Sequence, residues 1–309
     1  MNRREAVTSS DLGPVVSLVT WIVEASVILA VVIKFTLSST IPGRRSRDDI
    51  ALFFATAFSV GFTVAISVAV SNGVGKHQET LPLHQLESLQ MAVYVAGIFF
   101  ILVSSCAQAS VILCLYDVTP SNSHRRFIKG IMLSLALIFL SSIFVAACPC
   151  RPPHVWKLFD SQCIDHLSFW EAYAGLSIAI ECALIVLPIF IIYYLRVGVK
   201  RKAILIGCFA ARLLVIGPFA TQIYEAQSLK SHLVDRTFYS WTYFLAIVFV
   251  QGLSIITVCI PYIRNVLLRM ESGMIQTGHL GLLNDHSITN EGSSFHSDLT
   301  RTLNHPPVV

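Results

Sequence analysis

Seven apolar segments, each long enough to cross a bilayer, take up most of the chain. A hydrocarbon core about 30 Å thick needs roughly 20 apolar residues of helix, and every segment reaches that length. Segments such as the first are apolar all round, whereas a helix on a soluble core would carry a polar stripe. The segments cover about residues 14–38, 50–71, 89–116, 128–148, 168–195, 203–225 and 239–262. The sequence therefore predicts an all-α polytopic membrane protein, a bundle of seven transmembrane helices.

Composition agrees with a membrane domain that leaves little chain for anything else. Hydrophobic residues make up 54% of the chain and charged residues 13%, which lies outside the range of ordinary soluble domains. We expect a short lead over residues 1–13, the bundle over 14–262 and a mostly disordered tail over 263–309, because the polar tail cannot bury a core. The first segment lacks the pattern of a cleavable signal peptide and is expected to stay in the membrane.

The basic residues predict how the bundle lies in the membrane. The loops after segments one, three and five carry ten Lys and Arg residues, and the loops after segments two, four and six carry five. Positively charged loops stay on the cytoplasmic side. We therefore expect the N-terminus outside, the tail in the cytoplasm and the protein in the plasma membrane. Because the positive charge sits in short loops between apolar segments, no nucleic-acid partner is expected.

Three cysteines lie at or in the loop between segments four and five, which is predicted to be extracellular: Cys148, Cys150 and Cys163. An oxidising compartment permits a disulfide there. We expect Cys163 to pair with Cys148 or with Cys150, and the alternative is that all three stay reduced. The other five cysteines fall inside apolar segments, where a free cysteine behaves as a small hydrophobic residue.

Five polar residues fall near the middle of the predicted helices: Glu24, Gln108, Glu181, Arg212 and Gln251. At 1.5 Å per residue, the three charged ones lie about 15, 18 and 13 Å from the nearer predicted helix end. A charge at that depth costs several kcal/mol unless it is paired or hydrated. We expect the five to form one cluster facing the bundle interior. It either binds a ligand or a proton or fixes helix packing as a structural network.

Three further residues in the apolar segments have expected local roles. Lys34, near the cytoplasmic end of the first segment, is expected to extend its ammonium group to the lipid headgroups. Pro188 and Pro218 are expected to kink the fifth and sixth helices.

Two loops on the predicted outer side carry recognisable patterns. After segment two, a Gly-x-Gly pair permits tight backbone geometry and is followed by Lys and His just outside the membrane. The loop after segment four is stiffened by prolines, and its Trp suits the headgroup belt or the mouth of a pocket. The residues of these outer-loop motifs are Gly73, Gly75, Lys76, His77, Pro152 and Trp156.

These patterns, in this order, resemble the fungal rhodopsin-like integral membrane protein family over roughly residues 20–265. The resemblance rests on Gly-x-Gly-Lys-His after segment two, Cys-x-Pro…Trp…Cys after segment four, an acid followed by Pro in segment five and Cys-x-Pro closing segment seven. The last two patterns are matched by Glu181 with Pro188 and by Cys259 with Pro261. The resemblance implies a receptor-like seven-helix membrane protein.

The sequence also departs from the family pattern. The family usually has Asp where Glu181 stands, and Lys where Gln108 precedes Ser110. It usually has an acidic residue in segment seven, where Val250 and Gln251 stand. A cation and an anion that are missing together suggest that the two pair within the bundle of other members.

The family name suggests retinal, but the sequence argues against it. A retinal pigment needs a lysine deep in the last helix to form the Schiff base. Residues 239–262 contain no lysine, so we expect no retinal, no other cofactor and no metal.

The function that these observations favour is a receptor for an extracellular or lipid-phase ligand, with a cytoplasmic signalling partner at the basic inner loops. A transporter or channel for small molecules or ions, using the midplane cluster, is the alternative. A membrane scaffold without a ligand is the second alternative. An enzyme is not expected, because the motifs HExxH and GxSxG are absent from the sequence.

Overall fold

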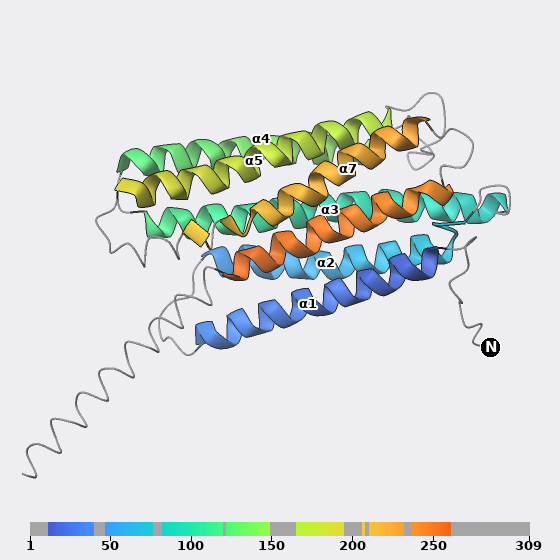
Figure 1. Cartoon of the computed structure of the whole chain (residues 1–309), viewed down its shortest axis with the longest axis horizontal. Coiled ribbons are helices and arrows are strands. Elements are labelled where there is room, and N and C mark those ends of the chain that lie inside the picture. The colour runs from blue at the N-terminus through green and yellow to red at the C-terminus, as the bar shows by residue number, and fades with distance from the viewer. Residues whose placement is uncertain are drawn as a thin grey trace, which may run out of the picture. The chain divides into compact units, whose positions relative to one another are not determined.

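The computed structural model describes residues 12–39, 47–76, 82–119, 122–148, 165–194, 206–207, 210–231 and 237–260. The elements over these residues are helices, and no strand occurs among them (Figure 1). They are α1 (Gly13–Ser39), α2 (Arg47–Ser71), α3 (Leu83–Val118), α4 (Asn122–Ala147), α5 (His166–Tyr194), α7 (Leu213–Ser231) and an unlabelled helix over Thr237–Ile260, here the C-terminal span. The prediction of an all-α membrane bundle is confirmed, and the tail over 263–309 lies outside the described residues.

Six of the described helices are long and apolar enough to cross a membrane, and α7 is not among them. The sixth predicted segment covered residues 203–225, whereas α7 begins at Leu213 and ends at Ser231. Its second half includes Gln222, Glu225 and Lys230, which lower its hydropathy. The helix therefore extends further than the apolar pattern that predicted it.

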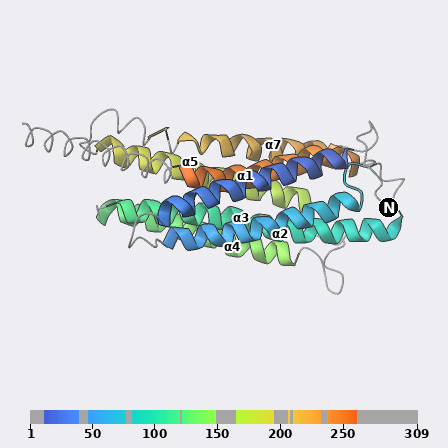
Figure 2. The same ribbon diagram turned by 90° about the horizontal axis from the view of Figure 1, so that it is seen from below.

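Most of the helices lie side by side in two layers. In Figure 2, α2, α3 and α4 lie on one side, α5, α7 and the C-terminal span lie on the other, and α1 runs obliquely across both. Among the labelled helices, the most extensive packing joins α2 to α3, followed by α5 with α7 and α3 with α4. Pro188 lies inside α5 and Pro218 inside α7. Both helices continue past the proline, which transmembrane helices tolerate when neighbours satisfy the freed carbonyls.

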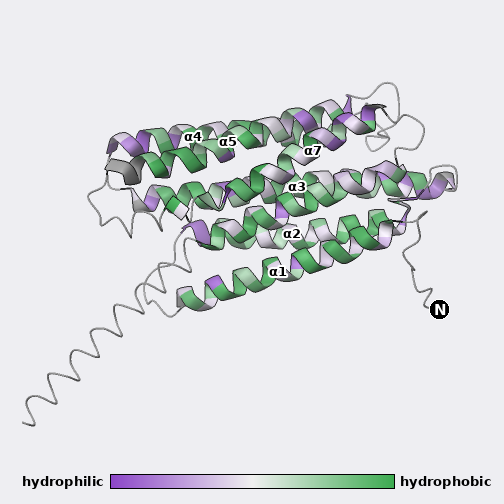
Figure 3. Cartoon of the chain, viewed as in Figure 1, coloured by the Kyte–Doolittle hydropathy of each residue, from purple (hydrophilic) through white to green (hydrophobic). Residues whose placement is uncertain are grey.

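Hydrophobic residues predominate along the length of the helices, and hydrophilic residues are more frequent near the helix ends (Figure 3). The outward-facing surface includes Leu29, Phe53, Leu133 and Phe144, each more than 60% exposed. Apolar exposure on this scale is a liability in water but matches the hydrocarbon of a bilayer. The interior is filled by large rings such as Phe100 and by small residues between them.

A turn after α2 joins three helix ends and is here called the glycine clamp (residues 73–75). Gly73 has φ 120° and Gly75 has φ 84°, a region that side chains disfavour. The Gly75 amide donates to the carbonyl of Thr237 at 3.0 Å, and its carbonyl accepts from the amide of Leu12 at 3.3 Å. The start of α1, the end of α2 and the start of the C-terminal span therefore meet there, at what we call the clamp end of the bundle.

Candidate functional site

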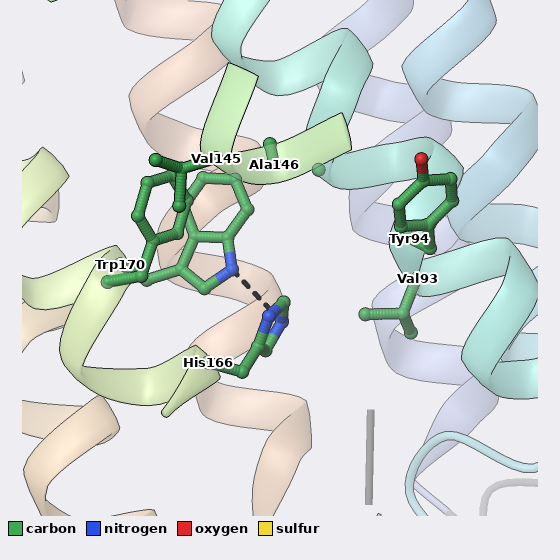
Figure 4. A pocket seen from close by; sticks show the side chains of 8 residues that line it. Val93, Tyr94, Val145, Ala146, His166 and Trp170 are labelled. Atoms are coloured by element: carbon green, nitrogen blue, oxygen red, sulfur yellow. Dashed lines mark hydrogen bonds between the residues drawn. The ribbon is translucent and has the colours of Figure 1, made fainter. Parts of the chain in front are cut away.

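A small cavity of about 20 Å³ lies near the clamp end, between α3, α4 and α5 (Figure 4). Its walls are mainly apolar, with an imidazole and an indole as the main polar groups. A volume of this size holds about one water molecule. The lining residues are Val93, Tyr94, Gly97, Val145, Ala146, His166, Phe169 and Trp170.

A second cavity, also of about 20 Å³, lies between α3, α5 and the C-terminal span. It shares four lining residues with the first cavity and adds aromatic side chains from α3 and the C-terminal span. The shared residues are Val93, Gly97, His166 and Trp170. These four therefore form a common wall between the two cavities.

The indole of Trp170 is the largest side chain in this wall, and three kinds of contact hold it. Its Nε1 donates a hydrogen bond to His166 Nε2 at 3.0 Å, as Figure 4 shows. Its ring meets Phe169 and Phe100 edge-on, with ring centroids 5.1 and 5.8 Å away. A Cβ at position 97 would lie 2.7 Å from Trp170 Cζ2, so only Gly97 leaves room for the indole.

The hydrogen bond from Trp170 also fixes the chemistry of His166. Because Nε2 accepts, the imidazole is neutral and carries its hydrogen on Nδ1. The wall between the cavities therefore contains one hydrogen-bond acceptor that is already occupied by an aromatic N–H.

Polar residues beside the cavities tie α5 to α7. Lys230 Nζ lies 2.8 Å from Glu171 Oε1 and donates to Ser168 Oγ at 2.9 Å. Ser168 in turn donates to the carboxylate of Asp165, and this hydrogen bond lowers the pKa of Asp165. The start of α5 and the end of α7 are thus held together by a short polar chain.

Deeper in the bundle, three of the five predicted midplane residues form one buried network. Arg212 Nε donates to Glu181 Oε2 at 2.8 Å, and its Nη2 donates to Oε1 at 3.3 Å. Gln108 Nε2 donates to the same Oε1 at 3.1 Å. Glu181 is 0% exposed and Arg212 1%. The pair lies between α5 and the turn before α7, and Gln108 attaches α3 to it.

The other two predicted residues belong to a second group. Glu24 accepts from Ser59 Oγ at 2.9 Å and from Thr63 Oγ1 at 3.1 Å. Gln251 Nε2 donates to the carbonyl of Ser59 at 3.5 Å. This group joins α1, α2 and the C-terminal span. Within the described helices, hydrogen bonds thus link the five residues as two groups rather than as the single cluster expected.

The expectation that Lys34 extends to the headgroups was wrong. Lys34 is 1% exposed, and its Nζ lies 3.3 Å from Asp48 Oδ2 and 3.0 Å from Asp49 Oδ1. Ser110 Oγ donates to the carbonyl of Asp48 at 2.9 Å. Two carboxylates at the start of α2 offer the ammonium group a closer partner than the headgroups. These residues form a third polar group, at the opposite end of the bundle.

The outer-loop residues are described only in part. Gly73, Gly75 and Lys76 belong to the turn after α2, whereas His77, Pro152 and Trp156 lie outside the described residues.

The disulfide prediction is likewise covered only in part. Cys148 is a free, exposed thiol in the structure. Cys150 and Cys163 lie outside the described residues, so a bond between those two stays a prediction. Among the residues that the structure describes, no three His, Cys, Asp or Glu side chains lie close enough to share a metal ion.

Long apolar helices whose few buried charged residues all have polar partners define an integral membrane protein. The family model of the fungal rhodopsin domain matches residues 33–269, and the chain belongs to that family. This result confirms the resemblance seen in the sequence. No curated protein and no solved structure matches the chain significantly.

The pair of His166 and Trp170 was not predicted from the sequence. The signal was present in the spacing of α5, because His166, Trp170, Tyr173, Ser177 and Glu181 recur at intervals of three and four residues. This period places all five on one face of the helix. One helix face therefore runs from the two cavities to the buried ion pair.

Proposed function

We propose that the protein is a receptor in the plasma membrane that binds a small extracellular or lipid-phase ligand at the two cavities. In this proposal it uses no retinal, catalyses no reaction and contacts a cytoplasmic partner at its opposite end. The observation that carries the proposal is the face of α5 that presents Trp170 to the cavities and Glu181 to Arg212. Trp170 and Glu181 are 11 residues apart, so about 16 Å of continuous helix joins them.

The ion pair is a suitable element for transmitting a small movement of α5. Buried charge pairs depend strongly on geometry, because the low-dielectric interior strengthens good contacts and penalises broken ones. Arg212 lies in a turn next to the start of α7, and Gln108 lies on α3. A shift of Glu181 therefore changes contacts on three segments at once. Packed elements of this kind switch between discrete arrangements rather than bending continuously.

The orientation in the membrane is part of the proposal. The excess of basic residues in the loops after α1, α3 and α5 supports a cytoplasmic location for the end opposite the clamp. The cavities then lie in the outer half of the membrane, and the basic loops face an acidic surface of a cytoplasmic partner. The absence of lysine from the C-terminal span supports a ligand other than retinal.

The test combines a ligand screen with a reporter of conformation. Purified full-length protein is screened against lipids, peptides and small metabolites for ligands that raise its unfolding temperature. A fluorophore on Ser123→Cys, exposed at the opposite end, then reports whether a stabilising ligand changes the environment there. We expect both effects from the same ligand. Failure of every ligand class to stabilise the protein would count against a receptor.

Variants then test the role of the ion pair. The double variant Glu181→Gln/Arg212→Gln removes both charges, so neither is left buried without its partner. We expect it to fold and bind ligand but to lose the fluorescence response at position 123. Glu171→Gln, on the same helix and in a more exposed ion pair, is the matched control and should keep the response. Loss of folded protein in the double variant would instead assign the pair a structural role.

A transporter or channel is the second candidate. Arg212 Nη1 and Gln251 Oε1 are buried polar atoms without a hydrogen-bond partner among the described residues. Such atoms are commonly satisfied by internal water, and water at this depth favours a polar path. Ion or solute flux into proteoliposomes would support transport, whereas ligand binding without flux would support the receptor.

A further inference from the structure

We propose that the ligand is a planar aromatic molecule with one N–H or O–H donor, of the indole or phenol class, and that it displaces the indole of Trp170. The role of this ligand rests on the proposed receptor function, but its binding can be measured independently of signalling. Its basis is the wall between the two cavities, where one aromatic ring and one acceptor separate two small spaces.

The size of the cavities requires Trp170 to move before a ring can bind. Each cavity of about 20 Å³ is too small for an aromatic ring while Trp170 stays in place. The indole lies in the wall that both cavities share, so its removal adds the volume of a ring to the two spaces and joins them. A ring-sized ligand therefore fits where the indole was.

The polarity of the wall selects a ligand with a hydrogen-bond donor. When the indole leaves, His166 Nε2 loses the N–H that it accepts at 3.0 Å. This acceptor is half-buried, and leaving it without a partner is costly, so a ligand that supplies a donor removes that cost. The surrounding rings of Phe100, Phe169 and Tyr173 meet the indole edge-on. They would meet another planar aromatic ring in the same way.

In this proposal the displaced side chain moves toward the membrane interface. Trp170 is one turn from the start of α5, which begins at His166. That depth corresponds to the membrane interface, where tryptophan is preferred because its ring is apolar and its N–H is polar. The exchange therefore replaces one aromatic donor with another and moves the first to a suitable environment.

The experiment compares ligands that differ only in the donor. Indole and 1-methylindole are titrated into the purified full-length protein. Binding is measured from the unfolding temperature and by titration calorimetry, which does not depend on a tryptophan signal. We expect indole to bind at least about tenfold more tightly, as one hydrogen bond to this acceptor implies. 1-Methylindole is the more apolar compound, so non-specific partitioning into lipid or detergent would give the opposite order.

Three variants locate the site. His166→Phe keeps a ring but removes the acceptor, and it should abolish the preference for indole. Trp170→Ala removes the displaced ring, and it should raise the affinity for indole while keeping the preference. Trp21→Ala is the control, because Trp21 is 52% exposed on the outer face of α1, and it should behave as wild type. If Trp170→Ala does not fold, His166→Phe alone still decides the test.

The outcomes separate this inference from the receptor proposal. Equal binding of the two indoles, or equal effects of His166→Phe and Trp21→Ala, would overturn the inference. A ligand of another class whose binding depends on Trp170 would also overturn it, but would leave the receptor proposal standing. Indole binding without a response at position 123 would support the inference and contradict receptor function.

Discussion

Six Asp, Glu, Lys and Arg side chains are buried among the described residues, and each has a polar partner within 3.3 Å. They are Glu24, Lys34, Asp48, Asp49, Glu181 and Arg212. The carboxylate of Glu24 is held by two hydroxyl groups, whereas the other five form ion pairs. An isolated charge in hydrocarbon costs several kcal/mol, so these partners are a condition for placing the residues there. Each of the three groups also crosses from one helix to another.

Gly75→Ala is expected to lower stability through the backbone of the clamp. A Cβ at this position would lie 2.7 Å from the amide nitrogen of Gly13 and would force a side chain into positive φ. We expect a loss of about 1–3 kcal/mol, measured by thermal unfolding in detergent. Gly130→Ala, exposed in α4 with no atom within 4 Å of its Cβ, is the control. A stability equal to the control would contradict this account of the clamp.

Lys34→Met is expected to leave two buried carboxylates without their cation. Breaking a buried pair by removing one partner costs about 3–5 kcal/mol. Lys230→Met removes an ammonium group that is 33% exposed, and exposed pairs contribute about 0–1 kcal/mol. Chemical denaturation of the two variants should therefore give clearly different losses. Similar losses would mean that the pairing of Lys34 adds little to stability.

The depth of a polar residue in the membrane was easier to predict from the sequence than the side chain that it pairs with. Counting along the helices correctly assigned Glu181 and Arg212 to the interior, and the structure pairs them. The count says nothing about rotation around the helix axis, so it did not separate Glu24 from that pair. It also missed the partners of Lys34, because Asp48 and Asp49 fall just before the second predicted segment.

At the scale of the helices, apolar length predicted position well. The predicted first segment, 14–38, differs from α1 by one residue at each end. The predicted third segment, 89–116, is shorter than α3, because the helix continues past polar residues such as Gln85 and Asp117 and ends at Leu83 and Val118. A hydropathy pattern marks only the part of a helix that lies in the hydrocarbon core, whereas the hydrogen-bonded helix extends beyond it. The same difference explains the end of α7.

A close helix crossing leads to a prediction about α1 and the C-terminal span. A Cβ at Gly252 would overlap Val23 Cγ1, and valine has little rotamer freedom to move away. Gly252→Ala should therefore destabilise the bundle, and Val23→Ala should restore stability in the double variant. Gly175→Ala in α5 has open space around its Cβ and is the control.

The measurement for this crossing is a double-mutant cycle in thermal unfolding. Contacting residues typically show interaction energies of about 0.5–3 kcal/mol. Additive effects of Val23→Ala and Gly252→Ala would show that the two helices do not meet at these residues.

For the whole molecule, the orientation in the membrane can be tested with single cysteines. Cys148 is exposed at the end of α4, on the clamp side. The experiment uses a variant in which the other cysteines are replaced and Cys148 is kept. We expect it to react with a membrane-impermeant maleimide in intact cells. Ser123→Cys, exposed at the other end of α4, should react only after permeabilisation. The reverse pattern would place the N-terminus in the cytoplasm.

The meeting of α1 with the C-terminal span also has a consequence for biosynthesis. Val23 emerges from the ribosome long before Gly252, and at roughly 5–20 residues per second the interval is on the order of tens of seconds. During that time α1 and α2 can already share the Glu24 hydrogen bonds, but the face of α1 that receives Gly252 has no protein partner. In the nascent protein this face of α1 therefore stays unpacked until the C-terminal span inserts. Membrane chaperones can bind it during that interval.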